Sequence, residues 1–137
     1  MIFPIKEWQK LKRGYVFRQK TFYNNGHIGL DIIAEKGTPI YAWQDLEVIN
    51  SFVGKDGGNT IWVKCPWNKR LFRLMHLQFK VLPGKYKEGQ IVAQVGDTGA
   101  LCKGSHLHLD ISQDGTLRLS GIANFEDPEM YFKTFAK

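Results

Sequence analysis

The sequence lacks most of the features that mark membrane, secreted or multidomain proteins. No run of about 18 apolar residues occurs, so no helix is expected to cross a membrane. The start, MIFPIKEWQK, is interrupted by Pro4 and Lys6 before an apolar stretch of secretory length forms, so we expect no signal peptide. No internal repeat, low-complexity tract or Pro/Gly/Ser-rich linker divides the 137 residues. The sequence therefore predicts a single globular domain.

Cysteine is scarce, and its spacing excludes several kinds of metal site. Only Cys65 and Cys102 are present, without CxxC spacing and without a nearby Cys/His cluster of the zinc-finger type. We expect two free, mostly buried thiols, as in a protein made in a reducing cytoplasm. The HExxH pattern of the commoner zinc proteases and the GxxxxGK phosphate loop are also missing.

Acidic residues are missing from one long segment. Residues 57–87 contain seven lysines and arginines and no acid, while residues 1–20 contain six against a single glutamate. The rest of the chain is net acidic, so these two segments account for the net charge of +6. A basic field favours polyanions such as nucleic acid or an anionic wall polymer, but an ordinary solvated surface has the same pattern. The charge alone identifies no partner.

Short runs rich in Val, Ile and aromatic residues dominate from residue 28 onward. They are separated by turn signals such as Pro83-Gly84 and Asp114-Gly115. The spacing predicts a mostly antiparallel β domain. The runs expected to form strands are Ile28–Ala34, Ile40–Trp43, Glu47–Val53, Thr60–Cys65, Leu71–His76, Ile91–Val95, His106–Ser112 and, more weakly, Thr116–Ser120.

Helix is expected only at the two ends of the chain. Ile5, Trp8 and Leu11 recur at helical spacing after Pro4. Near the C-terminus, Asp127-Pro128 has the pattern of an N-cap followed by proline at the first helical position, with a helix over Glu129–Phe135.

Histidines are few, but two of the four lie two residues apart in the stretch SHLHLDI. Side chains alternate between the faces of a strand, so His106, His108 and Asp110 share one face while the leucines between them share the other. Two imidazoles on one face form half of a metal site, whereas the alternative is a polar, solvent-facing strand. The pattern does not decide which of the two histidines would bind metal.

A second element, His27-Ile28-Gly29-Leu30-Asp31, places a histidine and a carboxylate four residues apart. HxxxD alone often occurs by chance. Together with the HxH strand, however, it supplies two nitrogens and one oxygen, which is the donor set of an open catalytic zinc site that leaves the fourth position to water.

The stretch GHIGLDIIAEKGTPIYA resembles the HxGxDxxAxxGTPVxA signature of lysostaphin-type peptidoglycan endopeptidases. LMHL is similar to their central HL element, GQIVAQVGDTGALCKGSHLHLDI to their GxTGxSxGxHLHFEI block, and DPEMYF to their NPxxYL segment. The resemblance runs from about Gly26 to Phe132 in the family's order. It implies an antiparallel β-sheet metallopeptidase domain with an open groove over residues 23–137, with residues 1–22 as a basic extension packed on the same domain.

Carried over position by position, the resemblance implies one Zn²⁺ held by His27, Asp31 and His108. His76 and His106 match the two catalytic histidines. One of them is expected to take a proton from a metal-activated water while the other stabilises the developing oxyanion, and the sequence does not assign these roles.

Two further residues are candidates for supporting roles. Tyr23, four residues before His27, could donate a hydrogen bond to the oxyanion, or it could serve only in packing. Asp110 lies where the family usually has Glu and could orient an imidazole through its N–H, or it could be a solvent-facing carboxylate.

The resemblance implies hydrolysis of peptide crosslinks or stem peptides of bacterial peptidoglycan, outside the cytoplasm. The alternatives are a non-catalytic wall-binding or regulatory member of the same fold and a phosphotransfer carrier domain, although Asp31 argues against the carrier. Specific nucleic-acid binding is not expected. Without a signal peptide, we expect a bacteriophage protein, either carried on the virion or released at lysis. The basic segments could then contact anionic wall polymer or a phage tail assembly.

Overall fold

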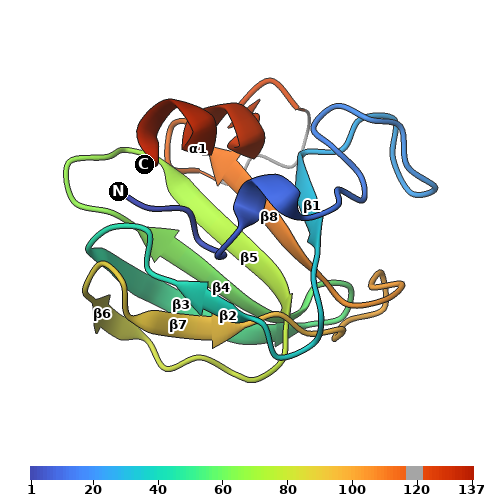
Figure 1. The fold of residues 1–137 in the computed structure, drawn as a ribbon. Helices are drawn as coiled ribbons and strands as arrows, with labels where there is room; N and C mark the ends of the chain where they lie inside the picture. The colour runs from blue at the N-terminus through green and yellow to red at the C-terminus, as the bar shows by residue number, and fades with distance from the viewer. Residues whose placement is uncertain (117–121) are drawn as a thin grey trace.

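The computed structural model describes residues 1–116 and 122–137, which form an antiparallel β structure with a helix at the C-terminal end (Figure 1). The predicted fold class is confirmed. The elements are η1 (Trp8–Lys10), β1 (Gly29–Ile33), β2 (Pro39–Tyr41), β3 (Leu46–Gly54), β4 (Gly58–Lys64), β5 (Leu71–Leu77), β6 (Gly84–Tyr86), β7 (Ile91–Gln94), β8 (His106–Ser112), β9 (Phe125–Glu126) and α1 (Pro128–Phe135).

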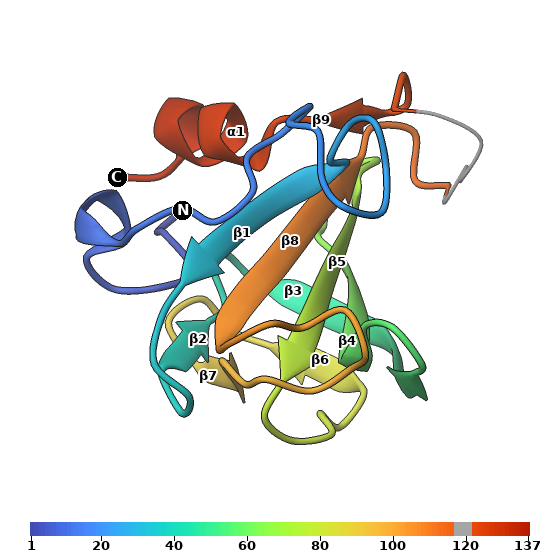
Figure 2. The ribbon, with the colours of Figure 1, turned by 90° about the vertical axis from the view of Figure 1, so that its right-hand side faces the viewer.

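The strands form one large and one small sheet. The large sheet has the order β1-β8-β5-β4-β3-β6, with β9 paired to β8, and the small sheet consists of β2 and β7. Every pairing among these strands is antiparallel. Figure 2 shows β1, β8 and β5 side by side, and segments distant in sequence therefore meet on this part of the sheet.

Alternation along β8 separates the polar face of this sheet from the core. Leu107, Leu109 and Ile111 are fully buried on one face. The intervening His106, His108 and Asp110 therefore point to the opposite face, as the sequence predicted. The apolar face of β8 joins a core that fixes this strand in register with its neighbours.

The helix α1 covers one side of this core. Asp127 caps it by accepting a hydrogen bond from the Glu129 backbone N–H at 2.9 Å, and Pro128 follows at the first helical position. Phe132 is fully buried, with its ring 5.3 Å from that of Trp8 and 5.8 Å from that of Trp43. Aromatic packing thus joins the N-terminal segment, the helix and the sheet.

The helical spacing near the N-terminus gives only one 3-10 turn, Trp8–Lys10. The turn ends because Leu11 is extended and the chain then runs beside β1, where Arg13 pairs with Ile32. Backbone hydrogen bonds join the Ile33 N–H to Lys12 O and the Gly14 N–H to Asp31 O, each at 2.9 Å. Pairing with the sheet edge replaces further helix here.

Most expected strands form with ends shifted by one or two residues, and His106–Ser112 forms as predicted. The short strands β6 and β9 were not predicted. Of the expected strand Thr116–Ser120, all but Thr116 lies outside the described residues. Among the described residues, no helix is long and apolar enough to span a membrane.

Candidate metal and catalytic site

The predicted site residues meet on the polar face of β1, β8 and β5. In the β1–β8 ladder Asp31 pairs with His108 and Ile33 pairs with His106. On the other side of β8, Arg73 of β5 pairs with Asp110. The strand register therefore brings together side chains that are far apart in the sequence.

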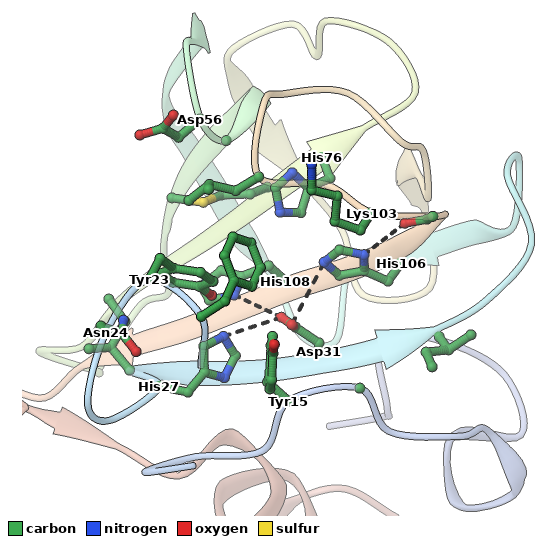
Figure 3. A pocket seen from close by; sticks show the side chains of 18 of the residues that line it. Tyr15, Tyr23, Asn24, His27, Asp31, Asp56, His76, Lys103, His106 and His108 are labelled. Atoms are coloured by element: carbon green, nitrogen blue, oxygen red, sulfur yellow. Dashed lines mark hydrogen bonds and ion pairs between the residues drawn. The ribbon is translucent and has the colours of Figure 1, made fainter. Parts of the chain in front are cut away.

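His27, Asp31 and His108 form a compact cluster of metal-ligating groups. One donor atom from each lies within 4.8 Å of the other two. The His108 Nδ1–H donates to Asp31 Oδ1 at 2.9 Å, and His27 Nε2 lies 3.5 Å from the same oxygen. All three residues are buried. Figure 3 shows their side chains converging on Asp31 from the loop before β1, from β1 and from β8.

Gly29 allows this convergence because it has no side chain. A Cβ at this position would lie 2.4 Å from the carbonyl oxygen of Leu109 and 2.9 Å from Cε1 of His108. Such separations are far below van der Waals contact, so a larger residue would push β1 away from β8. The glycine between His27 and Asp31 therefore fixes the close approach of the His108 ring.

The chemistry of this cluster fits a metal ion. Both ring nitrogens of His27 are buried without a hydrogen-bond partner among the described residues, which is costly for an imidazole unless another ligand is present. Burial lowers the pKa of His27, and the charge of His108 lowers it further, so the ring is neutral and able to ligate. Burial raises the pKa of Asp31, but the hydrogen bond and charge from His108 outweigh this and keep the carboxylate ionised.

His108 lies between two carboxylates. Its Nδ1–H faces Asp31, while its Nε2–H donates to Asp110 Oδ2 at 2.8 Å. Burial lowers the pKa of His108, but the hydrogen bonds to Asp110 and Asp31 outweigh it and raise the pKa to about 9. Because Asp110 holds Nε2, Nδ1 is the nitrogen that would face a metal ion beside Asp31.

Asp110 is fully buried, which does not fit a solvent-facing carboxylate. Its Oδ2 accepts hydrogen bonds from Arg73 Nε at 3.0 Å and Nη2 at 2.9 Å, in addition to the bond from His108. Burial raises the pKa of Asp110, but the Arg73 charge and the His108 hydrogen bond lower it overall. Sequence analysis missed Arg73 because its place opposite Asp110 depends on the β5–β8 register.

His76 and His106 form a second pair of imidazoles beside this cluster, with ring centroids 4.7 Å apart. The His106 Nδ1–H donates to the Gly104 carbonyl at 2.9 Å, and its Nε2 lies 3.8 Å from Asp31 Oδ2. The His76 Nδ1–H donates to the Thr98 carbonyl at 2.8 Å. Both rings are thereby oriented through Nδ1, which leaves Nε2 as the nitrogen that can accept a proton.

The backbone around His76 is shaped for this arrangement. His76 has φ 66°, a left-handed conformation that is uncommon for a residue with a side chain. The Thr98 hydroxyl donates to the Leu77 carbonyl at 2.9 Å and accepts from the Asn59 N–H at 3.0 Å, so the Thr98 backbone is held in place. Burial lowers the pKa of His76 to about 4, despite the Thr98 carbonyl, and the ring is neutral near pH 7.

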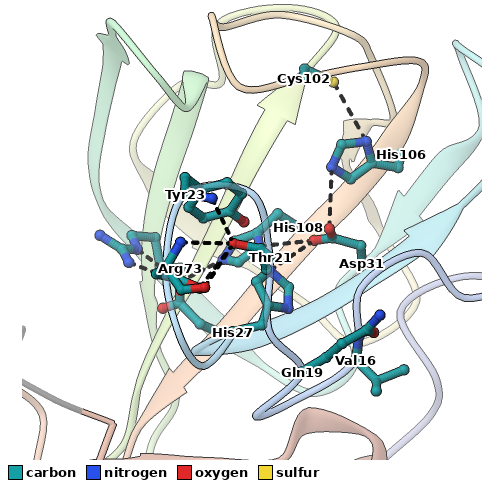
Figure 4. Close-up of polar contacts among 12 residues, drawn as sticks. Val16, Gln19, Thr21, Tyr23, His27, Asp31, Arg73, Cys102, His106 and His108 are labelled. Carbon is teal, nitrogen blue, oxygen red and sulfur yellow. Dashed lines mark hydrogen bonds and ion pairs between the residues drawn. The ribbon is translucent and has the colours of Figure 1, made fainter.

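The two imidazole sets meet at one carboxylate. Oδ1 of Asp31 faces His27 and His108, whereas Oδ2 faces His106. Figure 4 shows the chain of contacts from Cys102 through His106 and Asp31 to His108. Asp31 therefore faces the other two candidate metal ligands and one of the candidate proton carriers, His106.

An open cleft of about 730 Å³ lies over these residues. The segment before β1 supplies aromatic side chains to it, namely Tyr15, Phe22 and Tyr23, and the opposite side includes Asp56 and Lys103 (Figure 3). The cleft is the open groove expected for the fold.

Tyr23 lies in this cleft with its ring centroid 6.4 Å from that of His27. Burial and the nearby Asp31 charge raise the pKa of Tyr23 to about 12, so its hydroxyl remains a hydrogen-bond donor. Tyr15, which sequence analysis did not single out, is closer to His27, at 5.7 Å between ring centroids. Only the folded path of residues 14–28 reveals that both tyrosines flank the site.

Both cysteines are free, as predicted. Cys65 is buried in the core, but Cys102 is only partly buried and lies beside His106, with Sγ 3.5 Å from Nδ1. Sequence analysis gave Cys102 no place near the site, because its approach depends on the turn at Gly104.

Comparison with known proteins finds relatives in sequence and in fold. Peptidoglycan DD-endopeptidase ShyC of Vibrio cholerae is 32% identical over 91 residues, which are 65% of this chain and 21% of that protein. The match thus spans about a fifth of the length of that relative. The structure of LytU has a TM-score of 0.76 at 27% identity and covers 94% of this chain and 89% of its own.

The catalytic domain of the antimicrobial peptidase lysostaphin from Staphylococcus simulans has a TM-score of 0.77 and covers 92% of this chain and 95% of its own. At 23% identity this likeness shows the fold. The model of peptidase family M23 matches residues 25–118, a range that carries all four histidines and Asp31. With most of its length matched, the chain belongs to peptidase family M23, and it has the fold of the lysostaphin catalytic domain.

Proposed function

We propose that this protein is a zinc-dependent endopeptidase that hydrolyses peptide crosslinks or stem peptides of bacterial peptidoglycan. Membership of family M23 supports peptidase activity, and the name of the relative ShyC supports peptidoglycan as the substrate. The observation that carries the proposal is the convergence of His27, His106 and His108 on the two oxygens of Asp31. It joins a metal-binding donor set to His106, which lies beside the second proposed proton carrier, His76, in the same cleft.

His27, Asp31 and His108 would hold the zinc ion. Two imidazole nitrogens and one carboxylate oxygen are the usual protein ligands of a catalytic zinc site with one open position. When bound, zinc would supply Lewis acidity, which makes water a stronger acid and a peptide carbonyl a better electrophile. Asp110 would keep His108 in the correct tautomer by accepting its Nε2–H.

His76 and His106 would carry the protons of the reaction. Each ring is fixed by an Nδ1–H bond to a backbone carbonyl, so each offers Nε2 to the substrate side. One Nε2 would accept the proton of the attacking water, and the other, when protonated, would donate to the carbonyl oxygen or the leaving amine. The Tyr23 hydroxyl would add a further donor for the oxyanion.

The remaining expectations are also part of this proposal. We propose residues 23–137 as the peptidase domain and residues 1–22 as an extension packed on it. This division is supported by the start of the family match at residue 25 and by the burial of Ile5 and Trp8. Contact with anionic wall polymer or a phage tail assembly, and a role on the virion or at lysis, stay predictions. Mass spectrometry of purified virions would test the phage role.

Digestion of purified peptidoglycan tests the proposed function. The zinc-loaded protein is incubated with walls of two defined crosslink chemistries, and the released fragments are analysed by mass spectrometry. We expect new N-termini at one class of peptide bond in one of the walls. Wall binding without any cleavage would instead support the non-catalytic alternative.

Two matched histidine variants separate metal binding from proton transfer. His106→Ala should keep the zinc held by His27, Asp31 and His108 and lose hydrolysis, whereas His108→Ala should lose hydrolysis and the zinc of this site as well. Zinc content is measured by elemental analysis, and circular dichroism confirms that each variant is folded. Full hydrolysis by both variants would show that the site is wrongly assigned.

A further inference from the structure

A second cluster of metal-ligating groups lies beside the first and shares no residue with it. His76, Cys102 and His106 each offer a donor atom, and these atoms lie within 4.8 Å of one another. The first cluster consists of His27, Asp31 and His108. Cys102 comes from the loop between β7 and β8, which Figure 4 shows above the His106 ring.

The separation between Cys102 and His106 in this second cluster fits tetrahedral coordination. Cys102 Sγ lies 3.5 Å from His106 Nδ1. A zinc ion bonded to nitrogen at about 2.0 Å and to sulfur at about 2.3 Å, with a tetrahedral angle, places these two atoms about 3.5 Å apart. The sulfur and the imidazole nitrogen are therefore already at the separation that a shared ion requires.

The loop turn at Gly104 holds both side chains in this position. The Gly104 carbonyl accepts a hydrogen bond from the Cys102 thiol at 3.1 Å and from the His106 Nδ1–H at 2.9 Å. Gly104 has φ 100°, a conformation that other residues rarely adopt. This one carbonyl orders the sulfur and the nitrogen side by side, and both atoms would exchange this hydrogen bond for a bond to the metal ion.

The third donor comes from a different strand. His76, on β5, is held through Nδ1 by the Thr98 carbonyl, so its Nε2 is available as a ligand. One thiolate and two imidazoles form a donor set that selects Zn²⁺ or a similar thiophilic ion over Mg²⁺ or Ca²⁺. Cys102 is only partly buried, which gives solvent and ions access to the cluster.

We propose that His76, Cys102 and His106 form a second, inhibitory site for Zn²⁺ or a similar thiophilic divalent ion. When the ion binds, the proton of the Cys102 thiol leaves to solvent, and the proton of the His106 ring moves from Nδ1 to Nε2. Both proposed proton carriers then serve as ligands and can no longer exchange protons with substrate. The second site itself does not depend on catalysis, but its inhibitory effect rests on the proposed function.

Cobalt titration of the reduced, metal-free protein tests the site without measuring activity. We expect the wild type to bind two Co²⁺ ions, of which one gives a thiolate-to-cobalt absorption band in the near ultraviolet. Cys102→Ser should bind one ion without this band. His108→Ala should lose the first site and keep the band, since the second cluster does not include His108.

Cys65→Ala is the matched control, because Cys65 is the other cysteine and is buried in the core away from the cleft. This variant should keep the thiolate band. The second site is refuted if the wild type shows no thiolate band. It is equally refuted if the band survives in Cys102→Ser or disappears in Cys65→Ala.

Hydrolysis assays then separate this inference from the proposed function. With one zinc per chain the wild type should be active, and excess zinc should inhibit it. Cys102→Ser should need at least about tenfold more zinc for the same inhibition, as expected when a metal site loses a ligand. Activity without a thiolate band overturns only the second site. A thiolate band in an enzyme that is inactive at one zinc per chain overturns only the proposed function.

Discussion

Arg73 and Asp110 lie opposite each other across the β5–β8 ladder, and the guanidinium donates through Nε and Nη2 to Oδ2 of the carboxylate at 3.0 and 2.9 Å. The same oxygen accepts the Nε2–H of His108. Arg73 thus compensates the charge of a fully buried carboxylate that orients a proposed metal ligand. This pairing makes the metal site sensitive to a residue that would not contact the metal.

Arg73→Met should weaken zinc binding by about 10- to 100-fold, because it leaves Asp110 buried without its cation and disturbs the orientation of His108. Removing one partner of a buried ion pair should also lower the free energy of unfolding by about 3 kcal/mol. Arg73→Lys keeps the charge but loses the two-bond geometry. Its zinc affinity and its free energy of unfolding should therefore lie between those of Arg73→Met and the wild type. Chelator competition and urea unfolding measure the two effects, and wild-type zinc affinity in Arg73→Met would contradict this role.

The stability of the metal-free protein should fall in alkaline solution. The pKa of His108 is raised from 6.5 to about 9, so folding stabilises its protonated form. The stabilisation of the folded protein by protonated His108 is complete below about pH 6.5, and it is lost as the pH rises through about 9. Urea unfolding of chelator-treated protein across this range should show the loss.

Asp110→Asn provides a control for this pH dependence, because it removes one of the two carboxylates that stabilise protonated His108. The alkaline loss of stability should become smaller in the variant. Zinc should also abolish the loss in the wild type, since a coordinated imidazole has already released its Nδ1 proton. An unchanged pH profile in Asp110→Asn would indicate that another group titrates.

Gly29→Ala should separate β1 from β8. The added Cβ would lie 2.4 Å from the Leu109 carbonyl oxygen and close to the His108 ring. We expect a loss of about 1–3 kcal/mol in the free energy of unfolding, together with weaker zinc binding. Gly54→Ala is the matched strand control, because its nearest contact would be an ordinary 3.7 Å. Equal effects of the two variants on zinc affinity would argue against the close-approach role of Gly29.

Tyr23→Phe should lower kcat by about a hundredfold with little change in KM, as expected when an oxyanion donor is removed. The hydroxyl is a donor at all working pH values because its pKa is raised to about 12. Tyr86→Phe serves as the control, because that hydroxyl donates to the Leu82 carbonyl outside the cleft. If Tyr23→Phe instead raises KM alone, Tyr23 binds substrate and does not stabilise the oxyanion.

The parts of the fold and site that are encoded locally could be predicted from the sequence. Alternation in His106–Ser112 defined the strand and the face that its histidines share, because strand geometry has a period of two residues. The cap at Asp127-Pro128 likewise identified the start of α1. These features depend on neighbours a few residues away.

The parts that depend on distant segments were missed. Arg73 meets Asp110 only through the β5–β8 register, and Cys102 meets His106 only through the turn at Gly104. The strands β9 and β6 have only two and three residues, so they are too short to show the alternation of apolar and polar residues that identifies a strand in the sequence. After Lys10, pairing with the sheet edge replaced the helix that local spacing indicated.

The carboxylate of Asp31 touches His106 through one oxygen and the proposed ligands His27 and His108 through the other. The His106 ring does not ligate zinc in the first site, but through Asp31 it is coupled to the charge of that site. The carbon-bound protons of the His106 ring should therefore shift in nuclear magnetic resonance spectra when the first zinc arrives. His106 then serves as a built-in reporter of loading, readable in an enzyme that has no substrate present.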